Sequence, residues 1–510
     1  MKKGKVYIVG AGPGDPGLIT VKGLDCIKQA DVIIYDRLIG ESLLRAASPN
    51  AEKIYVGKGR NCHAKEQTDI NQLLITKAEE GKIIVRLKGG DPFVLGRGGE
   101  EAEALTMNHI PFELVPGISS SLAVPAYAGI PVTDRRMASS FTVITGHEDP
   151  QKDKSNIAWD KISTGSDTLV FLMGMENMAY IVDQLIRNGR TSSTPVAVIS
   201  HGTSPEQQTV VGTLGDIISR TEKENFQPPA IIVVGKVVQL RDSLRWFDNR
   251  PLFGKRILVT RAAHQANELS ELLLQYGAAP VEMPVIKIEP PPAWKELDQA
   301  ILNLKNYHWI IFTSVNAVEV FYERLYTLNL DTRQFAGIQV GAIGSATGEA
   351  LEQRGLRPDY IPETYTSQGF LAGLKKRDIS GRHVLLPRAD IAGNELAEGI
   401  ARLGAEIHQV TAYQTTVTTE ATSRGKQMLL EGEIDVVTFT SASTANNLLA
   451  IMDHEWKIIN NVITACIGPN TAAALTEKGL KADIVASKHT IPGLVEAVEQ
   501  YFLEKEGENG

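Results

Sequence analysis

The residues with the clearest capacity for chemistry lie in a glycine-rich segment, residues 89–101, with the sequence GGDPFVLGRGGEE. Its five glycines allow the backbone to approach a ligand closely. Asp91 can accept hydrogen bonds from an amine or a hydroxyl, and Arg97 can bind a carboxylate through two parallel hydrogen bonds. We interpret this segment as a loop that binds a polar ligand, with a flexible surface loop as the alternative.

Two further segments have ligand-binding character. Residues 10–16, GAGPGDP, follow an apolar run, which is where a phosphate-binding loop would lie. Pro13 and Pro16 break the GxGxxG spacing of such loops, however. A strained loop that shapes a cleft explains the segment equally well. Residues 119–121 are three serines at the start of a predicted helix, where hydroxyls and free N–H groups can bind polar ligand atoms. Simple helix capping explains one serine better than three.

The elements that must position these loops are strands alternating with helices. Apolar runs occur at residues 6–9, 31–35, 83–87, 168–172, 196–200 and 231–234. Between them lie segments such as 69–79, in which Ile70, Leu73, Leu74 and Ala78 fall on one helical face. This alternation predicts an α/β fold with mainly parallel sheets covered by helices.

The chain divides near residues 245–256, where Pro251 and Gly254 precede a new strand. The second half contains an internal duplication: residues 257–261 match 384–388, and 312–314 match 439–441, each 127 positions apart, with later matches 124 apart. Duplication predicts two similar lobes with a ligand in the cleft between them. We expect domains at 1–116 and 117–246, a linker at 247–254, one lobe at 255–290 with 415–500, and the other at 291–414.

Hydroxyl and arginine side chains recur at the predicted strand ends of both lobes, and ligands of open α/β sheets bind at the carboxyl ends of strands. Hydroxyls and helix N-termini there suit carboxylate groups. Ordinary helix capping is the alternative for any single residue, but the repetition favours a facing pair of anion sites. The candidate substrate-binding residues of this half are Thr260, Arg261, Thr313, Ser314, Arg388, Thr440 and Ser441.

Composition excludes several function classes. A net charge of −8 and an aromatic content of 6% argue against nucleic-acid binding. The three cysteines are dispersed, which predicts neither a zinc site nor disulfides and fits a reducing cytoplasm. No apolar stretch approaches the ~20 residues that span a bilayer. We therefore expect a cytoplasmic protein with a small-molecule substrate and no metal.

The order of motifs in residues 4–245 resembles the uroporphyrinogen-III C-methyltransferases, a family of tetrapyrrole methylases. The motifs are VGAGPGDPGLIT, YDRL, VGKG, GGDPFVLGRGGEE and VPGISSSLAVPAYAGIPVT. The resemblance implies two α/β domains with S-adenosylmethionine between them, and a homodimer formed through this half. It assigns Asp36 as proton acceptor and Lys58 as proton donor. Its cofactor contacts fall on Pro13, Gly89, Gly90, Asp91, Val94, Ser119, Ser120, Met173, Gly202 and Ala230.

The residue types suit that chemistry. The pyrrole loses a proton as its β-carbon is methylated, so a carboxylate base is sensible at Asp36, although a strand-end cap is the alternative. Lys58 could equally bind a substrate carboxylate. Many relatives have Thr-Ala at 119–120, so Ser120 departs from the pattern and its contact can be through the backbone alone. The substrate is a polycarboxylate, which makes Arg37 and Arg97, together with Lys58, Arg60 and Arg86, plausible electrostatic partners.

Residues 254–500 resemble uroporphyrinogen-III synthase. That family acts on hydroxymethylbilane without a cofactor, expels its hydroxyl, inverts ring D and closes the macrocycle. Tyr413 matches a tyrosine suggested to assist departure of the hydroxyl. Its duplicate position is Ile286, so repeat packing does not require a tyrosine. A structural tyrosine on a hinge strand is the alternative.

These resemblances predict a bifunctional enzyme. The second half would convert hydroxymethylbilane to uroporphyrinogen III, and the first half would methylate that product at C2 and C7 with S-adenosylmethionine, giving precorrin-2. One alternative is a methylase acting on another corrin intermediate. The other makes the second half a tetrapyrrole-binding module without turnover.

Overall fold

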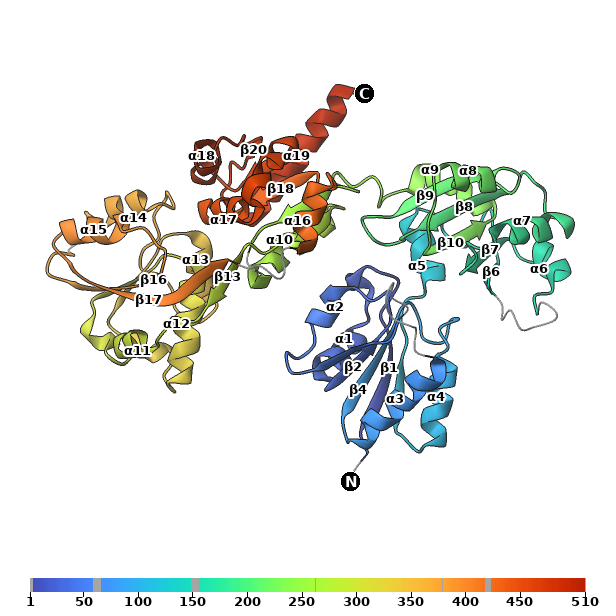
Figure 1. Ribbon diagram of the computed structural model, residues 1–510, viewed down its shortest axis with the longest axis horizontal. Coiled ribbons are helices and arrows are strands. Elements are labelled where there is room, and N and C mark those ends of the chain that lie inside the picture. The colour runs from blue at the N-terminus through green and yellow to red at the C-terminus, as the bar shows by residue number, and fades with distance from the viewer. Residues whose placement is uncertain are drawn as a thin grey trace. The chain divides into compact units, whose positions relative to one another are not determined.

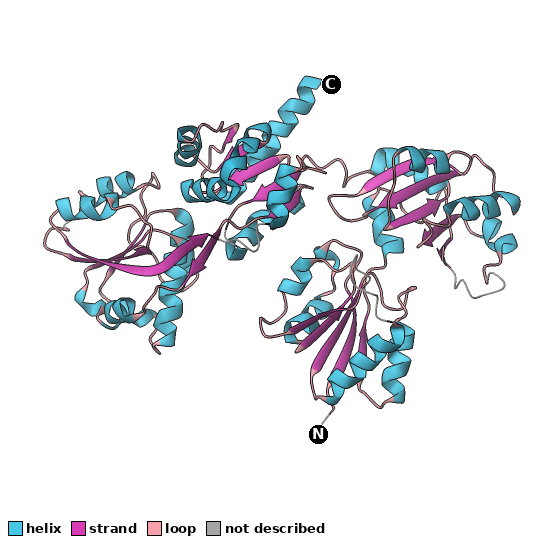
Figure 2. Ribbon diagram, in the orientation of Figure 1, coloured by secondary structure: helices cyan, strands magenta, loops and turns pink. Residues whose placement is uncertain are grey.

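The computed structural model describes residues 3–57, 66–147, 156–261, 263–377, 379–417 and 423–509. They form two compact units, Met1–Gly254 with Tyr276–Ala279, and Lys255–Gln275 with Pro280–Gly510. Helices and strands alternate through both units (Figure 2), so the predicted α/β class is confirmed. No helix within the described ranges is long and apolar enough to cross a bilayer.

The first sheet of unit 1 is parallel throughout, as predicted. Its strands, in spatial order, are β3 (Glu52–Tyr55), β2 (Val32–Tyr35), β4 (Ile83–Lys88), β1 (Lys5–Gly10) and β5 (Phe112–Val115). Its helices are η1 (Pro16–Leu18), α1 (Val21–Gln29), α2 (Glu41–Arg45), α3 (Gln67–Glu79) and α4 (Gly98–Met107). Because all five strands run the same way, the loops that follow them emerge at one edge (Figure 1).

The second sheet of unit 1 differs from the expected parallel pattern. Its order is β6 (Phe141–Thr145), β7 (Thr168–Leu172), β10 (Ala230–Val234), β8 (Pro195–Ser200) and β9 (Gln208–Thr213). Only β6 and β7 pair in parallel, and β10 runs antiparallel to both of its neighbours. The reason is connection length: the loop 201–207 between β8 and β9 has no helix and is too short for a parallel crossover, so these strands form an antiparallel pair.

The helices of this second domain are α5 (Ser120–Tyr127), α6 (Trp159–Gly165), α7 (Met178–Arg187), α8 (Ile217–Lys223), η2 (Lys236–Leu240) and α9 (Arg241–Leu244). The core lies between α6, α7 and the sheet on one face, and between α5, η2 and the sheet on the other.

Unit 2 contains two further sheets, one in each lobe. The first has the order β12 (Ala279–Glu282), β11 (Arg256–Val259), β18 (Val436–Phe439), β19 (Ile463–Cys466) and β20 (Ile484–Val485). Its helices are α10 (Ala263–Gln275), α16 (Ser423–Leu430), α17 (Ala442–Met452), η5 (Asp453–Asn461), α18 (Pro469–Glu477) and α19 (Ile491–Asn509).

The second lobe has the sheet order β13 (Ile286–Glu289), β17 (Glu406–Val417), β16 (His383–Ala389), β14 (Trp309–Phe312) and β15 (Gln339–Ala342). Its helices are α11 (Lys295–Leu302), η3 (Leu304–Asn306), α12 (Val315–Thr327), η4 (Thr332–Phe335), α13 (Ser345–Glu352), α14 (Ser367–Leu374) and α15 (Glu395–Arg402). Every pair in this sheet is parallel except β13 with β17.

The predicted duplication is confirmed element by element. β11 and β16 begin 127 positions apart, as do β12 and β17, β14 and β18, and α12 and α17. β15 and β19, α13 and α18, and α14 and α19 begin 124 positions apart. The copies are interleaved in space: one sheet joins β11 and β12 of the first copy to β18–β20 of the second, and the other sheet does the reverse. Neither copy can therefore complete a sheet alone.

β17 is long enough to serve two roles. Residues 406–413 pair in parallel with β16, whereas Gln414–Val417 pair antiparallel with β13. β13 and the end of β17 thus run side by side at the edge of the second lobe's sheet, where the chain passes between lobes (Figure 1). By the boundaries expected from the sequence, β13 and residues 415–417 fall in the first lobe, whereas the structure places them in the sheet of the second lobe.

The segment 247–254, expected to be a linker, packs on unit 1. Phe247 is 3% exposed, and its ring lies 4.8 Å from that of Tyr127 and 5.4 Å from that of Phe253. Arg241 and Asp248 form an ion pair that holds the segment against α9. These residues belong to the folded core of unit 1.

We predict that a fragment of residues 1–254 unfolds cooperatively, and that residues 1–240 are markedly less stable. The shorter fragment lacks Phe247, and removing a buried phenylalanine from a core costs about 3–5 kcal/mol. In a domain of this size the melting temperature should fall by about 10 °C, measured by circular dichroism. Equal melting temperatures would show that the segment is dispensable for the fold.

Candidate active sites

Three loops meet at the edge of the first sheet, because β1 lies between β4 and β5. The loops after β1 and β4 are joined by two backbone hydrogen bonds, Gly12 N to Gly90 O at 3.2 Å and Gly90 N to Gly12 O at 2.7 Å. The loop after β5 is joined through Asp91, whose Oδ2 accepts from Gly117 N at 3.0 Å. Asp91 Oδ1 accepts from Phe93 N at 2.8 Å, so the carboxylate also orders its own loop.

The backbones approach too closely at this junction for side chains. A Cβ atom on Gly117 would lie 2.3 Å from Gly90 O, and one on Gly10 would lie 2.6 Å from Gly117 Cα. Gly90 has φ +67°, a conformation that favours glycine. The loops thus pack backbone against backbone into a cradle of bare main chain, which fits a cofactor bound through main-chain groups.

The other predicted cofactor residues of this domain surround the junction. Pro13 is half-buried and Val94 is exposed at the surface of the glycine-rich loop. Ser119 caps α5: its Oγ accepts from Ser121 N at 3.3 Å and shares a 2.8 Å hydrogen bond with Ser121 Oγ. Its hydroxyl is therefore used by the helix, whereas Ser120, the first residue of α5, is half-buried.

The second sheet brings its predicted residues to one edge. Met173 follows β7 and Gly202 follows β8, while Ala230 begins β10, which runs antiparallel to both strands. Met173 is 53% exposed and has φ +56°. Two contacts tie the first domain's Asp15 to the second domain: Thr203 Oγ1 accepts from Asp15 N at 3.1 Å, and Tyr127 donates to Asp15 Oδ2 at 2.7 Å.

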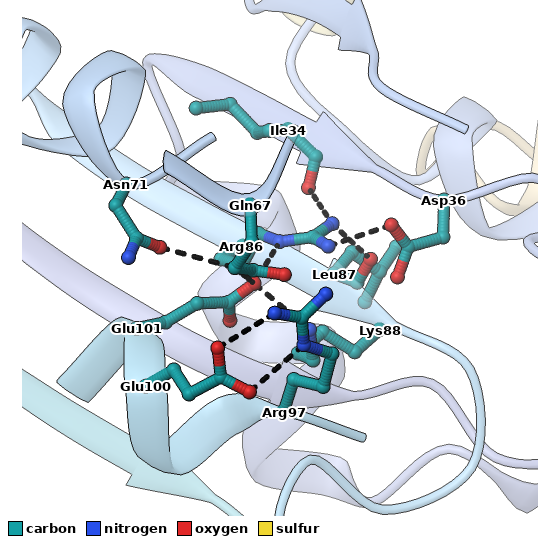
Figure 3. Close-up of polar contacts among 10 residues, drawn as sticks. All are labelled: Ile34, Asp36, Gln67, Asn71, Arg86, Leu87, Lys88, Arg97, Glu100 and Glu101. Atoms are coloured by element: carbon teal, nitrogen blue, oxygen red, sulfur yellow. Dashed lines mark hydrogen bonds and ion pairs between the residues drawn. The ribbon is translucent and has the colours of Figure 1, made fainter. Parts of the chain in front are cut away.

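Asp36, the predicted proton acceptor, follows β2 and belongs to a network of charged residues (Figure 3). Its Oδ1 accepts from Arg86 Nη2 at 2.6 Å. Arg86 Nε donates to Glu101 Oε1 at 3.0 Å, and Lys88 Nζ donates to the same oxygen at 2.8 Å. Gln67, from α3, contacts that oxygen at 3.3 Å. Burial and the neighbouring Arg86 lower the pKa of Lys88, which Glu101 partly offsets.

The network corrects one sequence-based interpretation. Arg86 is 2% exposed and bound to Asp36 and Glu101, so it does not present its charge to a substrate carboxylate. Arg37 is exposed, and Arg97 is exposed but pairs with Glu100 at 2.7 Å. Lys58 and Arg60 lie outside the described residues. Sequence reasoning missed the roles of Lys88, Gln67 and Glu101, although Lys88 directly precedes the glycine-rich motif and Glu101 is its last residue.

In unit 2 the structure brings Tyr413 to the predicted hydroxyl residues. The Tyr413 ring is 6% exposed and packs in the core of the second lobe. Its hydroxyl lies 3.1 Å from Ser314 Oγ, and Ser314 caps α12 by accepting from Ala317 N at 3.2 Å. Thr313, which precedes Ser314, is half-buried at the end of β14.

Two of the predicted substrate contacts are used by the protein itself. Thr260 is 1% exposed and donates to Thr438 O at 2.7 Å within the sheet. Arg388 is buried, and its guanidinium donates to Gly393 O at 2.9 Å and to Ala392 O and Gln409. Thr260 is thus enclosed within the sheet, whereas Arg388 holds the loop after its own strand and also lines the cavity described below.

The remaining candidates lie in the first lobe. Ser441 caps α17 in a reciprocal pair with Thr444, and Thr440 precedes it at the end of β18. Thr440-Ser441 therefore occupies the position that Thr313-Ser314 occupies in the other lobe. Arg261 pairs with Glu268 at 3.6 Å, and burial lowers the pKa of Arg261.

A cavity of about 630 Å³ opens beside Thr313, a size that accommodates a sizeable ligand. It is lined by the start of α14, including Thr366, Ser367 and Gln368, and by the loop held by Arg388. Asn470, from α18 of the other lobe, completes the lining. The α14 start was not singled out from the sequence, where Thr-Ser-Gln reads only as a helix cap. No group of three or more metal-ligating side chains occurs within the described ranges.

Two family models match the chain. Residues 5–218 match the Tetrapyrrole (Corrin/Porphyrin) Methylases, and residues 267–496 match Uroporphyrinogen-III synthase HemD. The "Porphyrin biosynthesis protein HemD" of Ruminiclostridium josui is 39% identical over 97% of this chain and 98% of its own length.

Shorter relatives match the N-terminal part. The "Uroporphyrinogen-III C-methyltransferase" of Methanocaldococcus jannaschii is 54% identical over 47% of this chain and 99% of its own length. The "S-adenosyl-L-methionine-dependent uroporphyrinogen III methyltransferase" of Methanosarcina barkeri is 52% identical over 47% of this chain and 94% of its own length. The chain belongs to the tetrapyrrole methylases in its N-terminal half and to the uroporphyrinogen-III synthases in its C-terminal half, a fusion of two enzymes.

We predict that Gly117→Ala weakens binding of S-adenosylhomocysteine by at least about tenfold, because the new Cβ would force the loops after β4 and β5 apart. Isothermal titration calorimetry on the purified chain measures this effect. Gly165→Ala is the matched control, since nothing lies within 4 Å of a Cβ there. Unchanged affinity in Gly117→Ala would mean that the junction does not hold the cofactor.

Proposed function

We propose that the C-terminal half converts hydroxymethylbilane to uroporphyrinogen III, and that the N-terminal half methylates this product at C2 and C7 to give precorrin-2. The observation that best supports methylation is the joining of the three glycine loops at the sheet edge from which Asp36 also emerges. That arrangement places a backbone cradle and a carboxylate on one edge of one sheet.

S-adenosylmethionine is the methyl donor in this proposal. When bound, it supplies a methyl group to a nucleophilic carbon and leaves as a neutral thioether. The residues that would hold it are the two sets at the sheet edges, Pro13, Gly89, Gly90, Asp91, Val94, Ser119, Ser120, Met173, Gly202 and Ala230. Backbone at the glycines would provide the close contacts, and Asp91 would keep the loops together.

The methyl group is transferred without its bonding electrons, so the substrate gains one positive charge. It must then release a proton, and atoms and charge balance when a base accepts that proton. Asp36 would be that base. Arg86 orients its carboxylate through the 2.6 Å ion pair. Lys58 would be the proton donor. Arg37 and Arg97, both exposed, would bind substrate carboxylates.

In the synthase half, the C–O bond of the hydroxymethyl group breaks and its oxygen leaves as water. The freed carbon bonds to the position of ring D that carries the bridge to ring C. That bridge bond breaks and re-forms at the other α-position of ring D with loss of a ring proton, so ring D is inverted as the macrocycle closes. Tyr413 would donate the hydrogen bond that assists departure of the hydroxyl, and its contact with Ser314 would orient the phenol. Thr313, Ser314, Thr440, Ser441 and Arg261 would bind substrate carboxylates near helix N-termini. Thr260 and Arg388 would act through the shape of the strand ends.

The proposal includes the organisation of the protein. The methylase domains would be residues 1–116 and 117–246, and the synthase lobes 255–290 with 415–500 and 291–414. We propose a cytoplasmic homodimer formed through the methylase half, with tetrapyrroles as its ligands and neither nucleic acid nor membrane as a partner. The low aromatic content and the negative net charge of −8 support the last point.

We predict that Asp36→Asn separates the two activities. Incubated with hydroxymethylbilane, the variant should make uroporphyrinogen III at the unaltered rate. With S-adenosylmethionine present, its methylation should be about 10²–10⁴-fold slower, because a general base is missing. Chromatography of the oxidised porphyrin isomers and of the dimethylated product measures both steps.

The unaltered chain is the reference in this experiment. Uroporphyrinogen I as its only cyclic product would show that the C-terminal half binds tetrapyrroles without turnover. Failure to methylate supplied uroporphyrinogen III would indicate another corrin substrate.

We predict that Tyr413→Phe slows formation of uroporphyrinogen III by about 10²-fold, because the phenol no longer assists loss of the hydroxyl. Methylation of supplied uroporphyrinogen III should be unchanged. Tyr307→Phe is the matched control. Tyr307 lies just before β14 and contacts His408 near the start of β17, at the opposite edge of the same sheet. A synthase rate in Tyr413→Phe equal to that of the control would assign Tyr413 to packing.

A further inference from the structure

Glu101 is a buried carboxylate that the proposed reaction does not use. It lies on α4 and is 0% exposed, although the neighbouring Glu100 is exposed and pairs with Arg97. Glu101 Oε1 accepts hydrogen bonds from Arg86 and Lys88, at 3.0 and 2.8 Å, and from Gln67 at 3.3 Å. Three elements, α3, α4 and β4, thus converge on one oxygen.

Arg86 connects this buried carboxylate to Asp36 (Figure 3). Its Nε binds Glu101, its Nη2 binds Asp36 at 2.6 Å, and its Nη1 contacts the carbonyl oxygens of Ile34 and Leu87 at 3.4 and 3.3 Å. Every nitrogen of the guanidinium therefore has a partner. Because guanidinium is planar and rigid, fixing one end of it fixes the direction of the other.

This arrangement is poorly explained by stability alone. Desolvating Arg86, Lys88 and Glu101 is unfavourable, and apolar side chains of similar volume often replace buried ion pairs without loss of stability. Arg86 does provide a fixed position for the network's carboxylate at the sheet edge, Asp36, whose side chain is 32% exposed. A base must be held within hydrogen-bond reach of the proton that it removes.

We propose that Glu101 is a positioning residue for methylation, acting through Arg86 on the carboxylate of Asp36. The inference rests on the proposed role of Asp36 as the base. The charged groups around Asp36 in the described residues are Arg86, which pairs with it, Lys88, which interacts with its charge, and Glu101, which is reached through Arg86. Lys58, on the β3 side, lies outside the described residues.

A double-mutant cycle tests whether Glu101 acts through Asp36. Glu101→Gln should lower kcat for methylation by about 10–100-fold, because small misplacement of a reacting group has effects of this size. Its affinity for S-adenosylhomocysteine, measured by calorimetry, should change by less than about threefold. In the Asp36→Asn background the same substitution should cause no further loss, since its target is already absent.

Glu103→Gln is the matched control: it removes the same charge from the same helix at an exposed position, and its kcat should be that of the unaltered chain. A further 10–100-fold loss in the Asp36→Asn background would overturn the inference and assign Glu101 to folding alone, while leaving Asp36 as the base. Full methylation by Asp36→Asn would instead overturn the assignment of the base, and with it the inference.

A second variant supplies an independent measurement. Arg86→Met removes the cation that links Glu101 to Asp36 and leaves Lys88 to pair with Glu101. Its kcat for methylation should fall by about 10–100-fold, and adding Glu101→Gln to it should cause no further loss, because the connection to Asp36 is already absent. A further loss in that double variant would contradict the role of Arg86 as the connection, and the cycle above decides the matter if Arg86→Met does not fold.

Discussion

The close approach of the backbone at Gly10, Gly90 and Gly117 is the contact on which the site of the first unit depends. Parallel strands deliver their following loops to one edge, but that alone leaves the loops independent. Here a bridge between Gly12 and Gly90 and the carboxylate of Asp91 join them into one surface. Because that surface is mostly main chain, its shape is set by the sheet register together with the one side chain of Asp91.

In the second unit, too, the candidate site residues lie at the ends of strands, but there they occur once in each lobe. Its two lobes repeat the same sheet order, so Thr313-Ser314 and Thr440-Ser441 recur at equivalent strand ends and both serines cap the following helix. Each sheet is built from pieces of both copies, so neither copy of the repeat can complete a sheet without the other. The chain therefore passes between lobes at β13 and the end of β17, and Tyr413 lies just before that passage, in register with the core of its own lobe.

The features of the fold that depend on local residue pattern and on spacing could be predicted from the sequence. The alternation of apolar runs predicted the α/β class, and the constant offsets predicted the duplicated lobes. The antiparallel second sheet was missed, because apolar runs do not reveal strand direction and the deciding feature is the short loop 201–207. Side-chain partners were also missed. Arg86 and Thr260 look available in the sequence, yet their partners lie on elements that only tertiary folding brings near. Arg388 bonds both to Gln409 on the neighbouring strand and to the loop that follows its own strand.

Glu100 and Glu101 show this limit most sharply, because they are adjacent and identical in type. Consecutive helical residues point about 100° apart, so one faces solvent beside Arg97 and the other faces the sheet. The buried residue is paired with two cations because β4 supplies Arg86 and Lys88 at alternate positions, both on the face toward α4. Two cations and two carboxylates then balance within one network, and Asp36 is its only member with a substantial solvent-exposed side chain among the four. A neutral, internally paired network can hold a reactive carboxylate at a sheet edge without leaving an uncompensated charge in the core.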